Sequence, residues 1–146
     1  MPLKSFRARI DDDAVQKLQL STSDGSTGYR ITKFQIINRS PGTNHTEAII
    51  KIYKTNPGTA ATLDVNFSDN TLLAVAYMGD NATAGQSGKD IIIFDNEVFN
   101  QDIYVTYKDN SNETEANYYI ELEQIKLDLN QNTLVTLKDI RNTSTQ

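Results

Sequence analysis

The sequence predicts an all-β protein, an antiparallel β-sandwich of jelly-roll-like type, which ends in a short C-terminal helix or an extended tail. Most of the chain consists of short runs rich in β-branched and aromatic residues, separated by clusters of Gly, Pro, Asn and Asp. Apolar residues make up 38% of the 146 residues, which suits a thin core between two layers of sheet. Because the length fits one domain, we expect a β-sandwich over residues 1–129 and a C-terminal docking segment over residues 130–146.

Alternating side chains define the first strands. Residues 6–10 place three apolar side chains on one face and Arg7 and Arg9 on the other, so this strand has an apolar face and a basic face. The three aspartates at residues 11–13 end it, and residues 18–20 mark a second strand. We expect the two arginines to pair across an interface or with an acid on an adjacent strand.

The third strand changes its pattern part-way along. Tyr29 and Ile31 share one parity, whereas Phe34 and Ile36 share the other. Either this strand is buried on both faces, or an extra residue near residues 32–33 shifts its register. We favour a β-bulge at this point.

The middle of the chain continues the pattern of strands and turns. Residues 47–53 run back after a turn, and residues 63–67 alternate apolar and polar side chains. Residues 72–78 are apolar on both parities, which is typical of a central strand covered on both faces, although periodicity alone leaves a helix open. Residues 79–89 are small and polar, and we expect them to form a mobile loop before a buried run at residues 91–94.

The last strands lie at residues 103–107 and 118–122, which both alternate cleanly. Polar residues 108–115 separate them, so we expect a hairpin. The apolar positions then change parity, which implies a bulge or a change of sheet near residues 123–124. The core between the two sheets is expected to contain Phe34, Val75, Val105, Ile120 and Leu122.

The C-terminal tail has a helical pattern. Residues 130–133 offer N-cap side chains, and Leu134, Leu137 and Ile140 recur at a spacing that places them on one stripe of a short helix. A helix of about eight residues is marginal in water by itself. The segment must therefore dock against the body of the domain or against a neighbouring chain.

The residue inventory argues against an active site. The chain has no cysteine, and its one histidine, His45, lies in a predicted turn, which leaves almost no material for the nucleophile, base and orienting group of acyl transfer. The glycines do not match a phosphate-binding loop. Paired acids can cleave glycosides, but Glu121 and Glu123 follow the solvent face of a strand, and residues 11–13 lack the spacing of a calcium loop. We expect no enzyme activity, no cofactor and no bound metal.

Charge and hydropathy limit the partners. A net charge of -5 disfavours nucleic acid as a partner, because nucleic-acid binding depends on clustered Lys and Arg. No apolar run approaches the ~20 residues of a membrane span, and the N-terminus lacks the apolar stretch of a signal peptide. We therefore expect a protein that is made in a cytoplasm, with no membrane or nucleic-acid partner.

Four stretches of the chain resemble known proteins: GYRITKFQI (residues 28–36), IFDNEVFNQDIYVT (93–106), NYYIELEQ (117–124) and LVTLKDIR (134–141). They are similar to a group of small virion-associated or uncharacterised proteins of tailed phages that infect marine picocyanobacteria and other open-ocean bacteria. The resemblance carries no mechanistic motif. It implies a setting, the phage particle, for a protein made in the host cytoplasm.

In that setting the first hypothesis is a capsid decoration or cement protein, and the alternative is a neck, tail or baseplate component. A third hypothesis is a carbohydrate-binding module used in adsorption, for which Tyr119 is the best exposed aromatic candidate, and a weaker fourth is a glycan-cleaving enzyme. The expected partners are other virion proteins and further copies of this chain in a homo-oligomer. The candidate interaction residues are Arg7, Arg9, Tyr119, Leu134, Leu137, Ile140 and Arg141.

Overall fold

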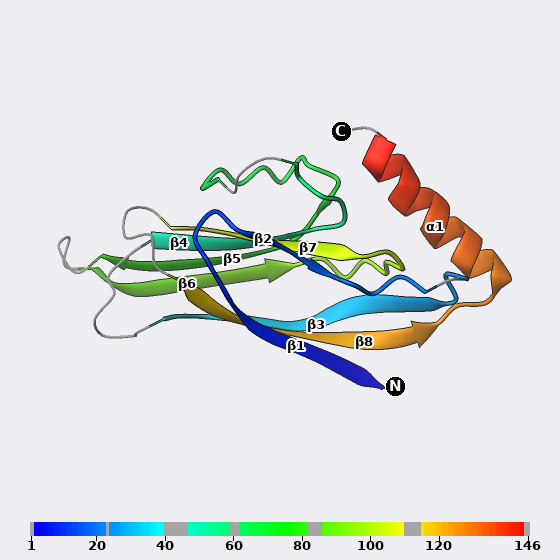
Figure 1. Ribbon diagram of the computed structural model, residues 1–146, viewed down its shortest axis with the longest axis horizontal. Coiled ribbons are helices and arrows are strands. Elements are labelled where there is room, and N and C mark those ends of the chain that lie inside the picture. Colours follow the sequence, from blue (N-terminus) through cyan, green and yellow to red (C-terminus); the bar gives the residue numbers. More distant parts are fainter. Residues whose placement is uncertain are drawn as a thin grey trace.

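The structure is a computed structural model that describes residues 2–22, 24–39, 47–58, 62–81, 86–109 and 115–144. Figure 1 shows two antiparallel sheets packed face to face, with a helix leaning across one end of the sandwich. This arrangement confirms the predicted all-β sandwich with a short C-terminal helix. The elements are β1 (Leu3–Ile10), β2 (Val15–Leu18), β3 (Thr27–Asn38), β4 (Glu47–Tyr53), β5 (Leu72–Asn81), β6 (Gln86–Phe94), β7 (Ile103–Asp109), β8 (Ala116–Lys126) and α1 (Leu129–Ser144).

The strand order is that of a jelly roll with one strand moved. One sheet has the order β1-β8-β3 and the other has the order β2-β7-β4-β5-β6. A jelly roll arises when a long hairpin rolls up, so that its first strand pairs with its eighth, its second with its seventh and its fourth with its fifth. All three of these pairings are present. The sixth strand, which would pair with the third, pairs here with β5.

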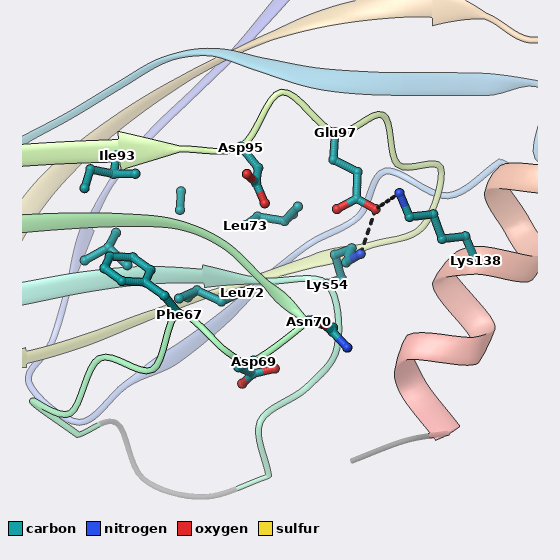
Figure 2. A pocket seen from close by; sticks show the side chains of 12 residues that line it. Lys54, Phe67, Asp69, Asn70, Leu72, Leu73, Ile93, Asp95, Glu97 and Lys138 are labelled. Carbon is teal, nitrogen blue, oxygen red and sulfur yellow. Dashed lines mark hydrogen bonds and ion pairs between the residues drawn. The ribbon is translucent and has the colours of Figure 1, made fainter.

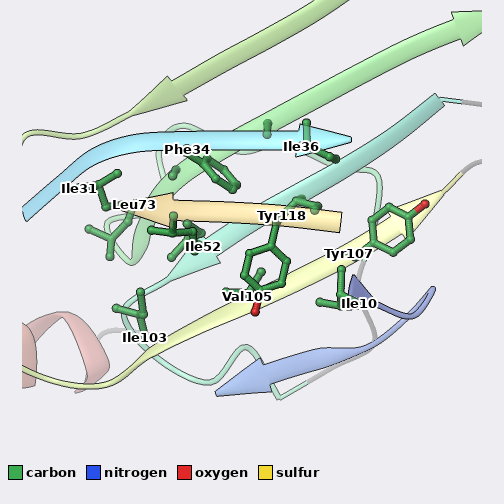
Figure 3. Close-up of a cluster of buried hydrophobic side chains, with 14 of the residues drawn as sticks. Ile10, Ile31, Phe34, Ile36, Ile52, Leu73, Ile103, Val105, Tyr107 and Tyr118 are labelled. Carbon is green, nitrogen blue, oxygen red and sulfur yellow. The ribbon is translucent and has the colours of Figure 1, made fainter. Parts of the chain in front are cut away.

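The main core fills the space between the two sheets. Figure 3 shows side chains from both layers meeting there, among them Phe34 and Ile36 of β3 and Val105 and Tyr107 of β7. Alternation along each strand turns these residues inward and leaves polar neighbours outside. Four of the five predicted core residues are confirmed as members of this cluster: Phe34, Val105, Ile120 and Leu122.

Val75 is the exception among the predicted core residues. It is buried, but it belongs to a separate small cluster with Ile49 and Leu72, against which Val65 also packs. The prediction that it lies between the sheets is wrong. β5 is apolar on both parities because it carries part of the main core on one face and this second cluster on the other.

The expected hairpin between residues 103–107 and 118–122 is also wrong. β7 lies between β2 and β4 in the five-stranded sheet, whereas β8 is the central strand of the other sheet. The chain therefore crosses from one layer to the other between them. Alternation predicts that both strands exist, but it does not encode which strand lies beside which.

The bulge in the third strand is confirmed. The register of β3 against β8 shifts between Ile31 and Lys33, and Ile31 and Phe34 both reach the main core. The second irregularity, expected near residues 123–124, is wrong, because the pairing of β3 with β8 runs without a shift from Leu122 to Lys126. The extra residue lies on β3 alone, and the parity of β8 changes where that strand runs beyond the main core.

Residues 63–67 form a loop and not the expected strand. Asx turns shape this segment: the Asn66 side chain accepts the Ser68 N–H at 3.0 Å, and Asp69 accepts the Thr71 N–H at 2.9 Å. The ammonium of Lys51 donates to the Asp64 carbonyl at 2.6 Å and ties the loop to β4. Short polar side chains that bond their own backbone compete here with a sheet ladder.

The run at residues 91–94 is less buried than expected. β6 is the edge strand next to β5, and Ile92 packs against the main core while Ile91 and Ile93 point to the opposite face and are about half exposed. The expected loop at residues 79–89 is shorter than predicted, because β5 continues to Asn81 and β6 begins at Gln86. The predicted turn that contains His45 lies outside the described residues.

Candidate functional site

The helix begins at a reciprocal cap. The Asp128 carboxylate accepts the Gln131 N–H at 2.8 Å, and the Gln131 side chain accepts the Asp128 N–H at 3.1 Å. This is a capping box, which satisfies two backbone donors that the first turn of a helix leaves free. The sequence pattern predicts the cap within residues 130–133, but the observed cap is Asp128, before that segment.

The face of α1 that meets the sandwich is polar. Its partner is Asn100, a fully buried residue whose side-chain amide donates to the Thr136 hydroxyl at 2.7 Å and lies 3.3 Å from the Asn132 carbonyl oxygen. The Asn100 N–H donates to the Asp139 carboxylate at 3.3 Å. Gly25 has a φ of 68° and allows the close approach of Asn132, whose oxygen would lie 2.6 Å from an added Cβ. We call Asn100, Asn132, Thr136 and Asp139 the polar seam.

The segment that carries Asn100 is held by β3. Phe99 and Tyr29 exchange two backbone hydrogen bonds, at 2.7 and 2.9 Å, and their rings stack 6.3 Å apart. Both rings belong to the main core. The core thus fixes the position of Asn100, and the polar seam in turn fixes the helix.

Glu97, Lys54 and Lys138 form an ion-pair triad that links α1 to the sandwich, as Figure 2 shows. One carboxylate oxygen of Glu97 accepts from the Lys54 ammonium at 2.9 Å and from the Lys138 ammonium at 2.8 Å. The Lys54 side chain is only 2% exposed. Burial by itself would raise the pKa of Glu97, but the hydrogen bonds from Lys138 and Lys54 outweigh it and hold that pKa below its usual value.

Burial dominates the titration of Asp139. Removal from water raises the pKa of its carboxyl from 3.8 to about 6, although the Asn100 N–H and the charges of Lys54 and Lys138 oppose the shift and Glu97 adds to it. Because the folded state holds this proton more tightly than the unfolded state, ionisation costs stability as the pH rises. The penalty is absent below about pH 4, grows toward pH 6 and is complete above it.

The variant Asp139→Asn is expected to be more stable than the wild type at pH 8, by about 1–3 kcal/mol. Its amide oxygen still accepts from Asn100, and it carries no charge to desolvate. Urea unfolding of both proteins between pH 3.5 and 8 measures the difference, which should vanish at the acid end. A constant difference across this range would contradict the assignment of the shift to Asp139.

The side of α1 that faces away from the polar seam carries an apolar stripe. Leu134, Leu137 and Ile140 are 69%, 54% and 56% exposed, so the predicted stripe exists and points away from the sandwich. We call these three residues the outer stripe. Arg141 lies in the same helix, and its side chain is outside the described part of the structure.

Hollows border the helix on several sides. The one in Figure 2 has a volume of about 460 Å³ and lies between Lys138, Glu97, Phe67 and Ile93. Two others of about 500 and 470 Å³ are lined in part by Ile140 and by Leu137. The helix is therefore attached along the narrow polar seam, with open space beside the outer stripe.

A second surface lies on the outer face of the three-stranded sheet. The register places Arg7 and Gln35 opposite Tyr119, on its two sides, and Arg9 and Ile37 opposite Asn117 in the same way. These two rows of side chains line a groove of about 410 Å³, which we call the outer groove. The structure thus brings together Arg7, Arg9 and Tyr119, which the sequence singled out separately.

Two of the three aspartates at residues 11–13 are engaged locally. Asp12 accepts the Asp109 N–H at 3.0 Å, and Asp13 accepts from the Lys108 ammonium at 2.9 Å, so these aspartates shape the turn between β1 and β2. Asp13 itself has a φ of 66°. Among the described residues, no group of three or more His, Cys, Asp or Glu side chains is placed to hold a metal ion.

Sequence reasoning missed the polar seam and the triad. Asn100, Glu97 and Lys54 lie in connections between strands, and hydrophobic alternation makes no prediction for such segments. They share no local sequence pattern that would select them from the other polar residues. No helix in the described part of the chain is long and apolar enough to cross a membrane.

No protein-family model matches the chain, and no curated protein matches its sequence.

Proposed function

We propose that this protein is a non-enzymatic structural protein of a phage particle, and in the first place a capsid decoration or cement protein. The observation that carries the proposal is the outer stripe on α1. A helix that only covered its own domain would turn its apolar side chains inward. This helix turns its polar face inward instead and leaves three aliphatic side chains exposed.

The energetics favour an interface at this stripe. Full burial of an aliphatic side chain of this size contributes ~1.5–3 kcal/mol, so the three together are a substantial increment to an association repeated over a symmetric assembly. The hollows beside Leu137 and Ile140 leave room for a partner to enclose the helix. The polar seam holds the helix in place beforehand, which lowers the entropy cost of docking.

Two further observations support the particle as the setting. The jelly-roll order is shared by viral capsid domains and lectins, which is an argument by analogy of fold. The resemblance of four stretches to virion-associated proteins of tailed phages points the same way. A neck, tail or baseplate component is the alternative within this proposal, and the number of copies per particle separates it from a decoration protein.

The test is a variant in which Leu134, Leu137 and Ile140 are all replaced by Gln. Because these side chains are exposed, the monomer should unfold at nearly the same urea concentration as the wild type. Incorporation into particles, measured by quantitative mass spectrometry of purified virions, should fall to a small fraction of the wild-type copy number. A matched control replaces the exposed Leu3 and Leu129, which lie outside the stripe, with Gln.

Removal of residues 130–146 is a less informative test. It would uncover the buried Asn100 and take Lys138 away from Glu97, so loss of folding and loss of assembly would coincide. Normal incorporation of the stripe variant would contradict the role of the helix. Absence of the wild-type protein from purified particles would contradict the whole proposal, and a dozen or so copies per particle would favour the neck or baseplate.

A further inference from the structure

We propose that the outer groove binds an acidic saccharide, with Arg7 and Arg9 facing its carboxylates and Tyr119, Asn117 and Gln35 facing its rings and hydroxyls. The groove lies at the start of β8, whereas α1 leaves from the end of that strand. The site is therefore separate from the outer stripe, and it does not depend on the function proposed above.

Arg7 and Arg9 make one side of the groove cationic, although the protein has a net charge of -5. Arg7 has no carboxylate within ion-pair distance among the described residues. Arg9 and Arg39 share one carboxylate, that of Glu115, at 3.3 and 4.0 Å. The local excess of positive charge favours an anion here. A guanidinium forms paired hydrogen bonds with a carboxylate, which gives direction as well as charge.

The acids nearby do not pair with Arg7 among the described residues. Glu123 is bound by Arg30 at 2.6 Å, farther along the sheet. Glu121 accepts the Tyr119 hydroxyl at 3.2 Å and lies within 3.4 Å of the Thr32 hydroxyl. Glu121 thus orients the Tyr119 ring beside Arg7 rather than pairing with the arginine.

The neutral side chains suit a sugar. The Tyr119 ring is half-buried and is held by its hydroxyl and by the Lys33 ammonium, which lies over the ring 5.8 Å from its centroid. Little entropy is therefore lost when a pyranose ring packs on the surface that Lys33 leaves open. The amides of Asn117 and Gln35 have no hydrogen-bond partner elsewhere in the described ranges, and each offers donors and an acceptor to hydroxyl groups. Ile37 is 59% exposed and adds an apolar edge. The volume of about 410 Å³ is within the ~300–1,000 Å³ of small-molecule sites.

The position of the groove disfavours an acidic peptide. An extended peptide gains affinity by adding main-chain hydrogen bonds to a sheet edge. The outer groove lies over β8, the central strand, which is paired on both sides by β1 and β3. A ligand in the outer groove must therefore bind to side chains and not to the main chain. The hydroxyl and carboxylate groups of a saccharide can form such hydrogen bonds.

The experiment measures the affinity of the full chain for a galacturonate tetrasaccharide by isothermal titration calorimetry. We expect saturable binding that is lost for the same tetrasaccharide after reduction of its carboxyl groups. Arg7→Gln and Tyr119→Ala should each weaken binding about tenfold or more. Tyr119→Phe keeps the ring but loses the hydroxyl that anchors it to Glu121, so it should weaken binding less than Tyr119→Ala does. Lys126→Gln removes the same charge from an exposed residue at the far end of β8 and should change the affinity less than twofold.

Several results would overturn the proposal. No binding at millimolar tetrasaccharide would remove the site, and equal binding of the reduced sugar would remove the role of the arginines. An equal loss in Lys126→Gln would show that only overall charge matters. Equal or tighter binding of an oligoglutamate of the same charge would assign the groove to acidic peptides instead. Circular dichroism of each variant verifies that it is folded.

Discussion

Replacement of Ile120 by alanine is expected to lower the free energy of unfolding by about 2–5 kcal/mol. Ile120 is fully buried and lies in the central strand β8, between Phe6 on β1 and Phe34 on β3. Truncation removes apolar area and leaves a cavity that two paired strands prevent from closing. Because the whole domain has a stability of about 5–15 kcal/mol, this is a large share of the total. Urea unfolding followed by circular dichroism measures the change.

The matched control is Ile37→Ala in the adjacent strand. The same side chain is lost there, but it is 59% exposed, so the cost should stay below about 1 kcal/mol. Equal effects at the two positions, or less than about 0.5 kcal/mol at Ile120, would contradict the packing of the two sheets described here.

Replacement of Glu97 by glutamine is expected to cost about 3 kcal/mol at pH 7, because it leaves the buried ammonium of Lys54 without its counter-charge. The lowered pKa of Glu97 means that its carboxylate stabilises the fold above its unfolded pKa of about 4.5, and that this contribution is lost as the pH falls through the folded value. The difference between variant and wild type should therefore shrink in acid. The effect has the opposite sign to that of Asp139.

Two controls locate the effect. Asp95→Asn removes an exposed carboxylate two residues away and should cost less than about 0.5 kcal/mol. Lys138→Met removes the exposed partner of Glu97 and should cost about 1 kcal/mol or less, since its side chain is 60% exposed. If Lys138→Met costs as much as Glu97→Gln, the helix contact, and not the buried Lys54, carries the energy.

The candidate surfaces differ in how far the sequence could predict them. The outer stripe is a local feature, because three positions on one helix share a face whatever the helix touches. Arg7, Arg9 and Tyr119 were each selected from the solvent face of a strand. Their meeting in one groove depends on the register of β1 against β8, more than 100 residues apart along the chain, and no local pattern encodes that register.

The polar seam could not be anticipated, since it joins Asn100 in a connection to Asp139 at the end of the chain. Its members are Asn, Thr and Asp, residue types that usually lie on the surface of a protein. Only the placement of Phe99 in the core brings the backbone of Asn100 beneath the helix. The raised pKa of Asp139 is likewise a consequence of burial, which the sequence pattern does not report.

The sequence by itself determined the class of the fold, the bulge in β3, the inward faces of β3, β7 and β8, and the apolar stripe of the C-terminal helix. All of these follow from periodicity, which tells which neighbouring residues share a face. The tertiary structure decided that β7 and β8 lie in different sheets, that Val75 packs outside the main core, and that β6 is an exposed edge. These depend on which distant strands pair, because burial is set by the neighbours that long-range packing supplies and not by the residues next in the chain.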